Sequence, residues 1–410
     1  MDQYVTCESV TEGHPDKVCD QVSDGILDEY LKQDPNARVA VETMVSGNTM
    51  MIAGEVTSSA RVDAAATARN IIREIGYTDP ALGFDCDSCV ILTNLNTQSP
   101  DIAMGVGQYG KPEGAIGAGD QGMMFGYACD ETENFMPLAY DLANRIVRRL
   151  AEVRKAGVLP WLRPDGKSQV TIRYGPDGEP YEASCIIVSA QHDETVSLPV
   201  IRREIRQQVI RPAVDERWLT KNTRVYINPT GRFVVGGPAG DTGLTGRKIM
   251  VDTYGGVGRH GGGAFSGKDP TKVDRSASYM ARYAAKNLVA AGLARKCEVE
   301  LDYAIGVPEP VSVSTDLFGT QTIPQEEVER LLREVFSFSV ADLLEQLDLK
   351  RPQYRELAAY GHFGREDGNF RWERLDKVPV LRDQAVSGLR AFLSHTRTEN
   401  NEKRKGRLLR

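Results

Sequence analysis

Two segments of the chain carry residues that could bind a phosphorylated ligand. The first is TEGHPDK at 11–17, where His14, Asp16 and Lys17 surround Pro15. Proline favours the first position of a helix, so we expect His14 to cap a helix and Asp16 and Lys17 to lie in its first turn. The free N–H groups and the dipole of such an end attract anions. A plain helix start with a capping side chain explains the same residues.

The second segment, 228–274, mixes cations and carboxylates with many glycines. Its charged residues include Arg232, Arg247, Lys248, Lys268, Lys272, Asp241, Asp269 and Asp274. Cations spaced through flexible backbone can converge on a polyphosphate, while nearby carboxylates hold its magnesium. A polar surface loop is the alternative interpretation. Because such a polar segment gains little from burial, we expect a bound anion, rather than a core, to order it.

Within this segment, GGGAFSGKD at 261–269 differs by one residue from a phosphate-binding loop. Asp269 stands where Ser or Thr would hold magnesium. That loop follows an apolar strand and opens a helix, whereas YGGVGRH precedes the glycines here. The sequence therefore predicts phosphate binding without that fold.

A predicted hairpin offers a further pair of carboxylates. The segment 39–56 forms two strands around the turn Ser46-Gly47-Asn48 and contains Glu42 and Glu55. If the loop has an even number of residues, both side chains point to the same face. Such a pair could hold a cation or the ammonium group of a ligand, or the two could be ordinary solvent-facing strand residues.

The elements that must position these residues follow a repeated pattern. Hairpins are predicted at 39–56, 170–190 and 298–314. Each adjoins an amphipathic helix that ends before a glycine, with the helices at about 64–75, 138–153 and 277–291 ending at Gly76, Gly157 and Gly292. This pattern predicts an α+β fold of three structurally similar domains with pseudo-threefold symmetry, each a sheet with helices packed on one face.

Another helix begins at Pro15 and carries Val18, Val22, Ile26 and Tyr30 at a spacing of four. A second row on it consists of Asp16, Asp20, Asp24 and Asp28, which we expect to be mostly a solvated face. The glycine-rich stretch 105–122 is typical of a mobile lid, and 231–267 of a site wall. The predicted organisation is an N-terminal domain (1–102), a flexible gate loop (103–116), a central domain (117–237), a C-terminal domain (238–383) and a tail extension of unknown role (384–410).

Length and composition narrow the function classes. A chain of 410 residues is expected to form two or three domains, and 41% hydrophobic with 26% charged residues is typical of a globular protein. A net charge of -7 argues against non-specific nucleic-acid binding, and the only strongly basic segment is the tail KRKGRLLR. No apolar run approaches the roughly 18 residues of a membrane helix, and the first residues, MDQYVTCESV, lack the basic and apolar regions typical of a signal peptide. We expect a cytoplasmic protein with neither nucleic acid nor membrane as partner.

The seven cysteines are scattered and odd in number. Cys86 and Cys89 form a C-x-x-C without a second pair that would complete a zinc site. We interpret them as reduced thiols at the start of a buried strand, with metal or redox use as the alternative.

Five motifs together resemble the S-adenosylmethionine synthetases (methionine adenosyltransferases). They are GHPDK at 13–17, GAGDQG at 117–122, DGKSQV at 165–170, GDTGLTGRK at 240–248 and GGGAFSGKDPTKVDRS at 261–276. They occur in the family's order, and the resemblance covers about residues 4–380. It implies that the methionine sulfur attacks C5′ of ATP and displaces triphosphate, which is hydrolysed to pyrophosphate and phosphate. A thioether carries no proton, so the attack needs alignment and charge stabilisation rather than a general base.

The resemblance also implies roles for individual positions. The catalytic positions are His14, Lys167, Arg247, Lys268 and Asp120. The ATP-binding positions are His14, Asp165, Lys167, Arg232, Phe233, Asp241, Arg247, Lys248, Ala264 and Lys268. Methionine is expected at Glu55, Gln98, Asp241 and Lys272. The metal ligands are Asp16 and Asp274 for Mg²⁺, with two ions per site, and Glu42 for K⁺.

The family resemblance further implies a homotetramer, built as a dimer of dimers with shared active sites. Two other functions stay open from the residues. One is a kinase or ATPase that transfers or releases the γ-phosphoryl group, and the other is a catalytically silent nucleotide-binding module.

Overall fold

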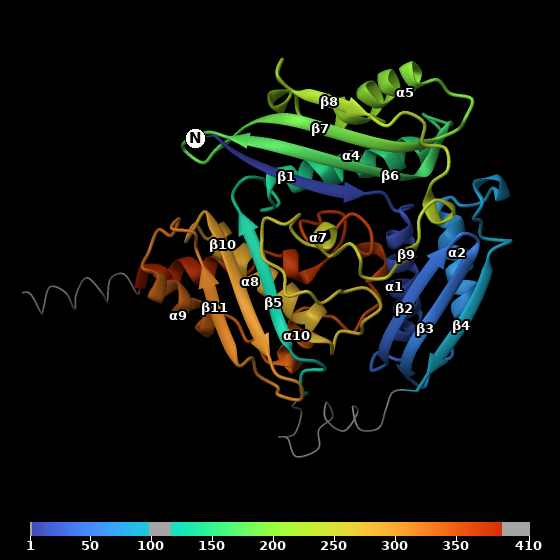
Figure 1. Cartoon of the computed structure of the whole chain (residues 1–410). Coiled ribbons are helices and arrows are strands. Elements are labelled where there is room, and N and C mark those ends of the chain that lie inside the picture. Colours follow the sequence, from blue (N-terminus) through green and yellow to red (C-terminus); the bar gives the residue numbers. More distant parts are fainter. Residues whose placement is uncertain (1, 98–115, 388–410) are drawn as a thin grey trace, which may run out of the picture.

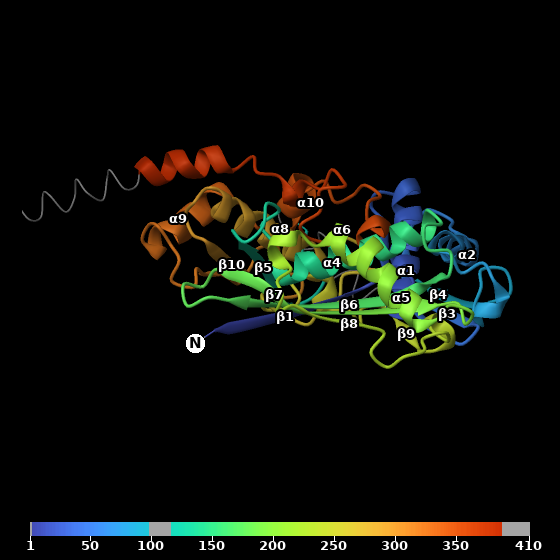
Figure 2. The same ribbon diagram turned by 90° about the horizontal axis from the view of Figure 1, so that it is seen from above.

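The computed structural model describes residues 2–97 and 116–387. Three sheets surround a common centre (Figure 1), with the sheets on one side of the molecule and most helices on the other (Figure 2). The strand orders are β1-β6-β7-β8, β4-β3-β2-β9 and β11-β10-β5. The predicted α+β fold of sheets covered by helices on one face is confirmed.

All three predicted hairpins are present and antiparallel. Their strands are β2 (Arg38–Ser46) with β3 (Thr49–Thr57), β6 (Leu162–Tyr174) with β7 (Pro180–His192), and β10 (Lys296–Tyr303) with β11 (Ser312–Asp316). In the first hairpin Ser46 pairs with Thr49, so the loop has two residues. Residues directly opposite one another on the two strands therefore share a face of the hairpin.

The remaining strands interlock the three sheets. These are β1 (Gln3–Val10) beside β6, β5 (Gly122–Cys129) beside β10, β9 (Gly243–Leu244) beside β2, and the parallel additions β4 (Val90–Asn96) beside β3 and β8 (Arg224–Ile227) beside β7. Because β1, β5 and β9 join sheets far from them in sequence, these three sheets are not built from contiguous stretches. The exact domain boundaries stay a prediction.

The helices that cover the sheets end where the glycines predict. α2 (Ala64–Ile75), α4 (Leu138–Lys155) and α8 (Val273–Ala290) are followed by Gly76, Gly157 and Gly292 in the left-handed conformation. The other helices are α1 (Pro15–Gln33), α5 (Leu198–Glu204), α6 (Arg211–Ala213), α7 (Ile249–Asp252), α9 (Gln325–Val335) and α10 (Val340–Gln346), with a π-helical turn at Ile205–Ile210.

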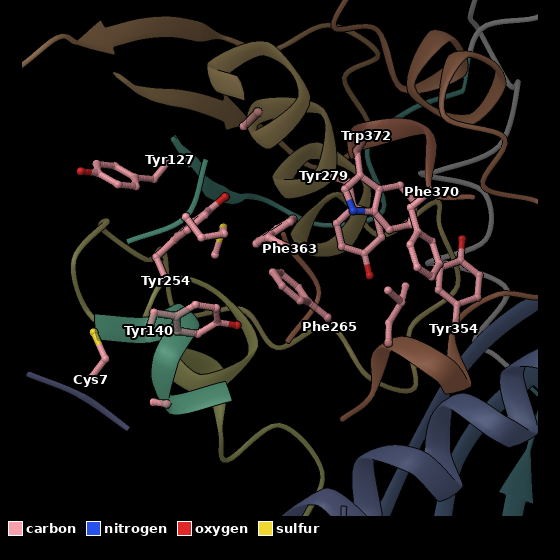
Figure 3. Close-up of a cluster of buried hydrophobic side chains, with 14 of the residues drawn as sticks. Cys7, Tyr127, Tyr140, Tyr254, Phe265, Tyr279, Tyr354, Phe363, Phe370 and Trp372 are labelled. Carbon is pink, nitrogen blue, oxygen red and sulfur yellow. The ribbon is translucent and has the colours of Figure 1, made fainter. Parts of the chain in front are cut away.

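An aromatic cluster fills the centre, where α8 meets the segments around 254–265 and 354–372 (Figure 3). Tyr279 stacks on Trp372 with ring centroids 4.2 Å apart, and Tyr254 stacks on Phe363 at 5.0 Å. Tyr254 and Phe265 are fully or almost fully buried there, although both belong to the glycine-rich segment 231–267. Our expectation that a bound anion, rather than a core, would order the segment 228–274 was therefore wrong, because its own aromatic side chains anchor it in the core.

Two further expectations about burial were wrong. The aspartate row of α1 is not solvated, since Asp16, Asp20, Asp24 and Asp28 are all buried. The strand after the C-x-x-C is not buried either, because β4 is an edge strand whose Val90 and Leu92 are about half exposed.

Candidate active site

The N-terminus of α1 forms the first half of the site. His14 caps the helix, and its Nδ1 accepts a hydrogen bond from the Asp16 N–H at 3.2 Å. Burial, together with the positive charges of Lys248 and Lys167, lowers the pKa of His14 to about 3. The ring is therefore neutral near pH 7, and because Nδ1 accepts, the proton lies on Nε2.

Asp16 binds the segment that follows β9. Its carboxylate accepts from Lys248 Nζ at 2.6 Å and from the Leu244 N–H at 3.0 Å, and Arg247 Nε lies 3.6 Å away. Burial alone would raise the pKa of Asp16, but the bonds from Lys248 and Leu244 outweigh it and the pKa is lowered. The GHPDK and GDTGLTGRK motifs thus meet at an ionised carboxylate.

Asp165 and Phe233 form a neighbouring wall. Asp165 Oδ2 accepts from the Gly237 N–H at 2.8 Å, and burial raises the pKa of this carboxyl to about 6. The Phe233 N–H donates to His192 Nε2 at 3.0 Å. Asp241 is tied to the same glycine, because its N–H donates to the Gly237 carbonyl at 3.0 Å, and its negative charge also raises the pKa of Asp165. 

A second group of predicted residues surrounds the start of α8. Lys268 Nζ donates to Asp274 Oδ2 at 2.6 Å, and Lys272 pairs with the buried Asp269. The segment that bears Asp120 reaches this group through a hydrogen bond from the Gly119 N–H to the Thr271 carbonyl at 3.2 Å.

Glu42 and Glu55 lie on the outer face of the first hairpin, next to Lys268. Glu42 pairs with Ala53, two residues from Glu55, so the predicted shared face is confirmed. Ala40 lies opposite Glu55 on β3 and forms a bridge to Lys268 on its other side. The carboxylates expected to bind potassium and methionine therefore share a face with the lysine expected to bind phosphate.

The two groups lie at different points along β2. The first group is attached to β2 where the Thr245 N–H donates to the Thr43 carbonyl. The second is attached where the Asp269 N–H donates to the Val39 carbonyl. Thr43 and Val39 are four residues apart, which corresponds to about 13 Å along a strand. No hydrogen bond or ion pair within the described residues joins the side chains of one group to those of the other. 

Arg232 and Ala264 form no hydrogen bond or ion pair with the predicted residues of either group in the described chain. Arg232 is exposed and pairs with the equally exposed Glu194 at 3.0 Å. Ala264 approaches Gly246, where an added Cβ would lie 2.5 Å from the Ala264 Cβ. Gln98 and all of the predicted gate but residue 116 lie outside the described residues.

Lys17 forms a buried charged cluster with two aspartates, and no functional role was predicted for it from the sequence. Lys17 is fully buried and pairs with Asp20 at 3.0 Å and with Asp252. A lysine without exposed surface needs such partners, because an uncompensated buried charge is costly. The sequence signal was the small residues Ser23 and Gly25 in α1, which indicate a helix that is packed on all sides.

The C-x-x-C motif lies outside both groups. Cys86 and Cys89 are buried, and burial raises the pKa of each thiol. Cys86 lies with Asp85 and Asp87 in an arrangement that could hold a metal ion. However, the Asp85 carboxylate already accepts hydrogen bonds from the N–H groups of Asp87 and Ser88, which gives it a local structural role.

Comparison with known proteins matches these features to one family along almost the whole chain. Models of S-adenosylmethionine synthetase match residues 2–100 (N-terminal domain), 115–233 (central domain) and 235–374 (C-terminal domain). The chain belongs to the S-adenosylmethionine synthetase family. This membership confirms the resemblance read from the five motifs, and with it the expected transferase activity that forms S-adenosylmethionine from ATP and methionine.

Two curated relatives extend over nearly the same length. S-adenosylmethionine synthase 1 from Rhodospirillum rubrum is 63% identical over 385 residues, which cover 94% of this chain and 99% of the relative. S-adenosylmethionine synthase 1 from Rhodopseudomonas palustris is 60% identical over 377 residues, or 92% and 97% of the two chains. Among the helices in the described part of the chain, none has the length and apolar character required to span a membrane.

Proposed function

We propose that the two groups of charged residues form the two sides of one site for ATP and methionine. The observation that carries this is a repeated ion pair. Lys248 pairs with Asp16 in the first group, and Lys268 pairs with Asp274 in the second, each at 2.6 Å. In both pairs a predicted phosphate-binding lysine holds a predicted magnesium ligand.

Binding of substrate would exchange the partners in each pair. The ammonium groups of Lys248 and Lys268 would turn to phosphate oxygens, and the carboxylates would be released to bind a cation. A unit charge pair about 4 Å apart is worth roughly 4 kcal/mol at an effective dielectric near 20. Cations placed where the triphosphate gains charge would therefore stabilise the transition state more than the ground state.

The donor sets suit the expected cations. Carboxylate oxygens are the ligands that Mg²⁺ prefers, and Asp16 is held ionised by its neighbours. Glu42 presents an exposed carboxylate for K⁺ on the outer face of β2. When bound, magnesium would neutralise part of the triphosphate charge, with Asp16 and Asp274 as its protein ligands.

His14 would act as a hydrogen-bond donor at the leaving oxygen of C5′. Its neutral ring has Nε2–H available while Nδ1 is used by the helix cap. The thioether sulfur needs no base, so the site has to align sulfur and carbon rather than move a proton.

An exposed apolar row supports the predicted oligomer with shared sites. Leu244, Met44, Met51 and Leu92 lie side by side across β9, β2, β3 and β4, on the same face as Glu42. Met44 and Leu92 are about half exposed in the single chain. An exposed apolar row is typical of an interaction surface, and this one is bordered by carboxylates expected to bind potassium and methionine, so a second copy on this face would complete the site. We further propose the tetrameric state and the cytoplasmic location on the family resemblance.

Product analysis tests the proposal against its rivals. Purified protein is incubated with ATP, methionine, Mg²⁺ and K⁺, and the products are separated by chromatography. We expect S-adenosylmethionine, pyrophosphate and phosphate in equal amounts, with phosphate release that requires methionine. Formation of ADP would favour a kinase or ATPase, and nucleotide binding without turnover would favour a silent binding module.

A further inference from the structure

The segment that carries Lys268 is held from beneath by a fully buried ion pair. Asp24 on α1 and Arg275 on α8 have no exposed surface. One terminal nitrogen of Arg275 donates to both oxygens of Asp24, at 2.9 and 2.6 Å. Charges this deep are costly unless well partnered, so the pair is expected to serve a specific geometry.

Both members of the pair also bind the backbone beside Lys268. Asp24 Oδ1 accepts from the Gly267 N–H at 2.7 Å, and the other terminal nitrogen of Arg275 donates to the Lys268 carbonyl at 3.0 Å. On the opposite side, β2 holds the same segment, because the Val41 N–H donates to the Gly267 carbonyl at 3.0 Å. The main chain on both sides of Lys268 is thus fixed between α1, α8 and β2.

Arg275 is also the neighbour of Asp274 in the first turn of α8. Asp274 points toward the Lys268 ammonium, while Arg275 points into the core under the Lys268 carbonyl. The ring of Tyr354 covers the Arg275 guanidinium at 4.4 Å (Tyr354 is labelled in Figure 3). This cation–π contact limits how far the guanidinium can move.

We propose that Asp24 and Arg275 are positioning residues for the reaction, which set the Lys268 main chain so that its ammonium and the Asp274 carboxylate face the same substrate phosphates. Neither residue reaches the surface, so neither touches substrate. The inference rests on the proposed role of Lys268. A small displacement of a catalytic group can reduce the rate by about 100-fold, which gives such a clamp its importance.

Arg275→Lys tests the inference, because an ammonium keeps the charge but cannot serve Asp24 and the Lys268 carbonyl in the guanidinium geometry. We expect kcat to fall by about 10- to 100-fold and the Mg²⁺ concentration for half-maximal rate to rise, with the KM for methionine within about threefold. Asp24→Asn keeps an acceptor for the Gly267 N–H but loses the charge, and should show a smaller fall of the same kind. It provides the test if Arg275→Lys does not fold.

Arg282→Lys is the matched control. Arg282 lies on the same helix, is equally buried, pairs with Glu373 at 3.1 Å and donates to the backbone carbonyls of Tyr127 and Phe135. We expect it to lower thermal stability as Arg275→Lys does, but to leave kcat and the Mg²⁺ requirement within about twofold.

The inference is overturned if folded Arg275→Lys keeps its kcat and Mg²⁺ requirement, or if Arg282→Lys loses as much. Failure of the proposed function would look different, since the unmodified protein would then form no S-adenosylmethionine. Failure of the site assignment would show as full turnover in Lys268→Ala.

Discussion

At the scale of single residues, the site is built from side chains whose charge state is fixed by burial and by their neighbours. His14 is kept neutral and Asp16 is kept ionised although the two are only two positions apart. The difference arises because both are buried next to the Lys248 cation, which favours the ionised form of an acid and disfavours that of a base.

Lys268→Ala should reduce turnover far more than methionine binding. In the proposed site the ammonium lies where the triphosphate would gain charge, so its loss affects the transition state first, and we expect kcat to fall by about 100- to 1,000-fold. The KM for methionine should change by less than about threefold. Steady-state kinetics measure both, with the exposed Lys221→Ala as a control for loss of a surface charge. Unchanged turnover would remove Lys268 from the mechanism.

His14 should make the protein sensitive to acid. Its folded pKa of about 3 lies below the value near 6.5 of an unfolded chain, so the unfolded state binds a proton first. The stabilisation is complete above about pH 6.5 and is lost as the pH falls toward 3. At about pH 5 the loss from this one residue amounts to about 2 kcal/mol.

His14→Asn retains a good helix cap but does not titrate. Thermal unfolding at about pH 7.5 and 5 should therefore show a smaller loss of stability in the variant than in the unmodified protein. Asp165, whose folded pKa is raised, titrates in both proteins and cancels in the comparison. Equal losses would show that His14 is not held neutral by the fold.

At the scale of elements, the buried aspartate row of α1 binds the backbone of distant parts of the chain. Asp20 accepts from the Gly246 N–H, Asp24 from the Gly267 N–H and Asp28 from the N–H groups of 353–355. Each aspartate satisfies backbone donors that would otherwise be buried without partners. The helix thereby fixes the positions of the two charged groups of the same chain relative to its own N-terminus.

Asp28→Ala should destabilise the protein by about 2–4 kcal/mol, because the buried N–H groups of Gln353 and Tyr354 and the partly buried N–H of Arg355 lose their acceptor. Asp28→Asn keeps one acceptor oxygen and should cost less. Glu29→Ala is the control, since its pair with Lys32 is largely exposed and worth at most about 1 kcal/mol. Denaturant unfolding measures the free energy of unfolding of all three variants. Similar losses for Asp28→Ala and Glu29→Ala would contradict the structural role of the aspartate row.

The burial of the aspartate row could not be predicted from the sequence, although other features of the fold could. The alternating direction of side chains along a strand predicted which residues of β2 and β3 share a face. Glycines after the last apolar residue predicted the ends of three helices. Both predictions were possible because each depends only on residues close together in the sequence. A row of aspartates at a spacing of four is the same whether it faces water or backbone N–H groups. Whether such an aspartate is buried depends on its hydrogen-bond partner, and the partner of Asp20 is the Gly246 N–H, 226 residues later in the chain.

The site was predictable to a similar extent. The family resemblance assigned Asp16, Arg247 and Lys248 to one site, and strand alternation predicted a shared face for Glu42 and Glu55 if the loop had an even number of residues. Arg232 could not be placed, because its exposed pairing with Glu194 depends on how two loops lie together. Asp24 and Arg275 carry no motif-level signal, since their function depends on contacts across 251 positions.

At the scale of the whole molecule, Glu42, Glu55 and Lys268 share the face of the first hairpin that also carries the half-exposed Met44. The row of Leu244, Met44, Met51 and Leu92 leaves an apolar strip there that a single chain does not cover. A closed dimer is the usual solution for a self-complementary apolar face. We propose that in such a dimer the first charged group of one copy lies beside the second charged group of the other.

Mixing two inactive variants tests whether the site is shared in this way. His14→Ala disables the first group and Lys268→Ala the second, so neither homodimer has an intact site. If each site combines the first group of one copy with the second group of the other, a mixed dimer has one intact site and one doubly defective site. Random reassociation after mild denaturation makes about half the dimers mixed, so activity should recover to about a quarter of that of the unmodified protein. Should the mixture stay as inactive as its components while gel filtration shows mixed dimers, each chain would contain its own complete site.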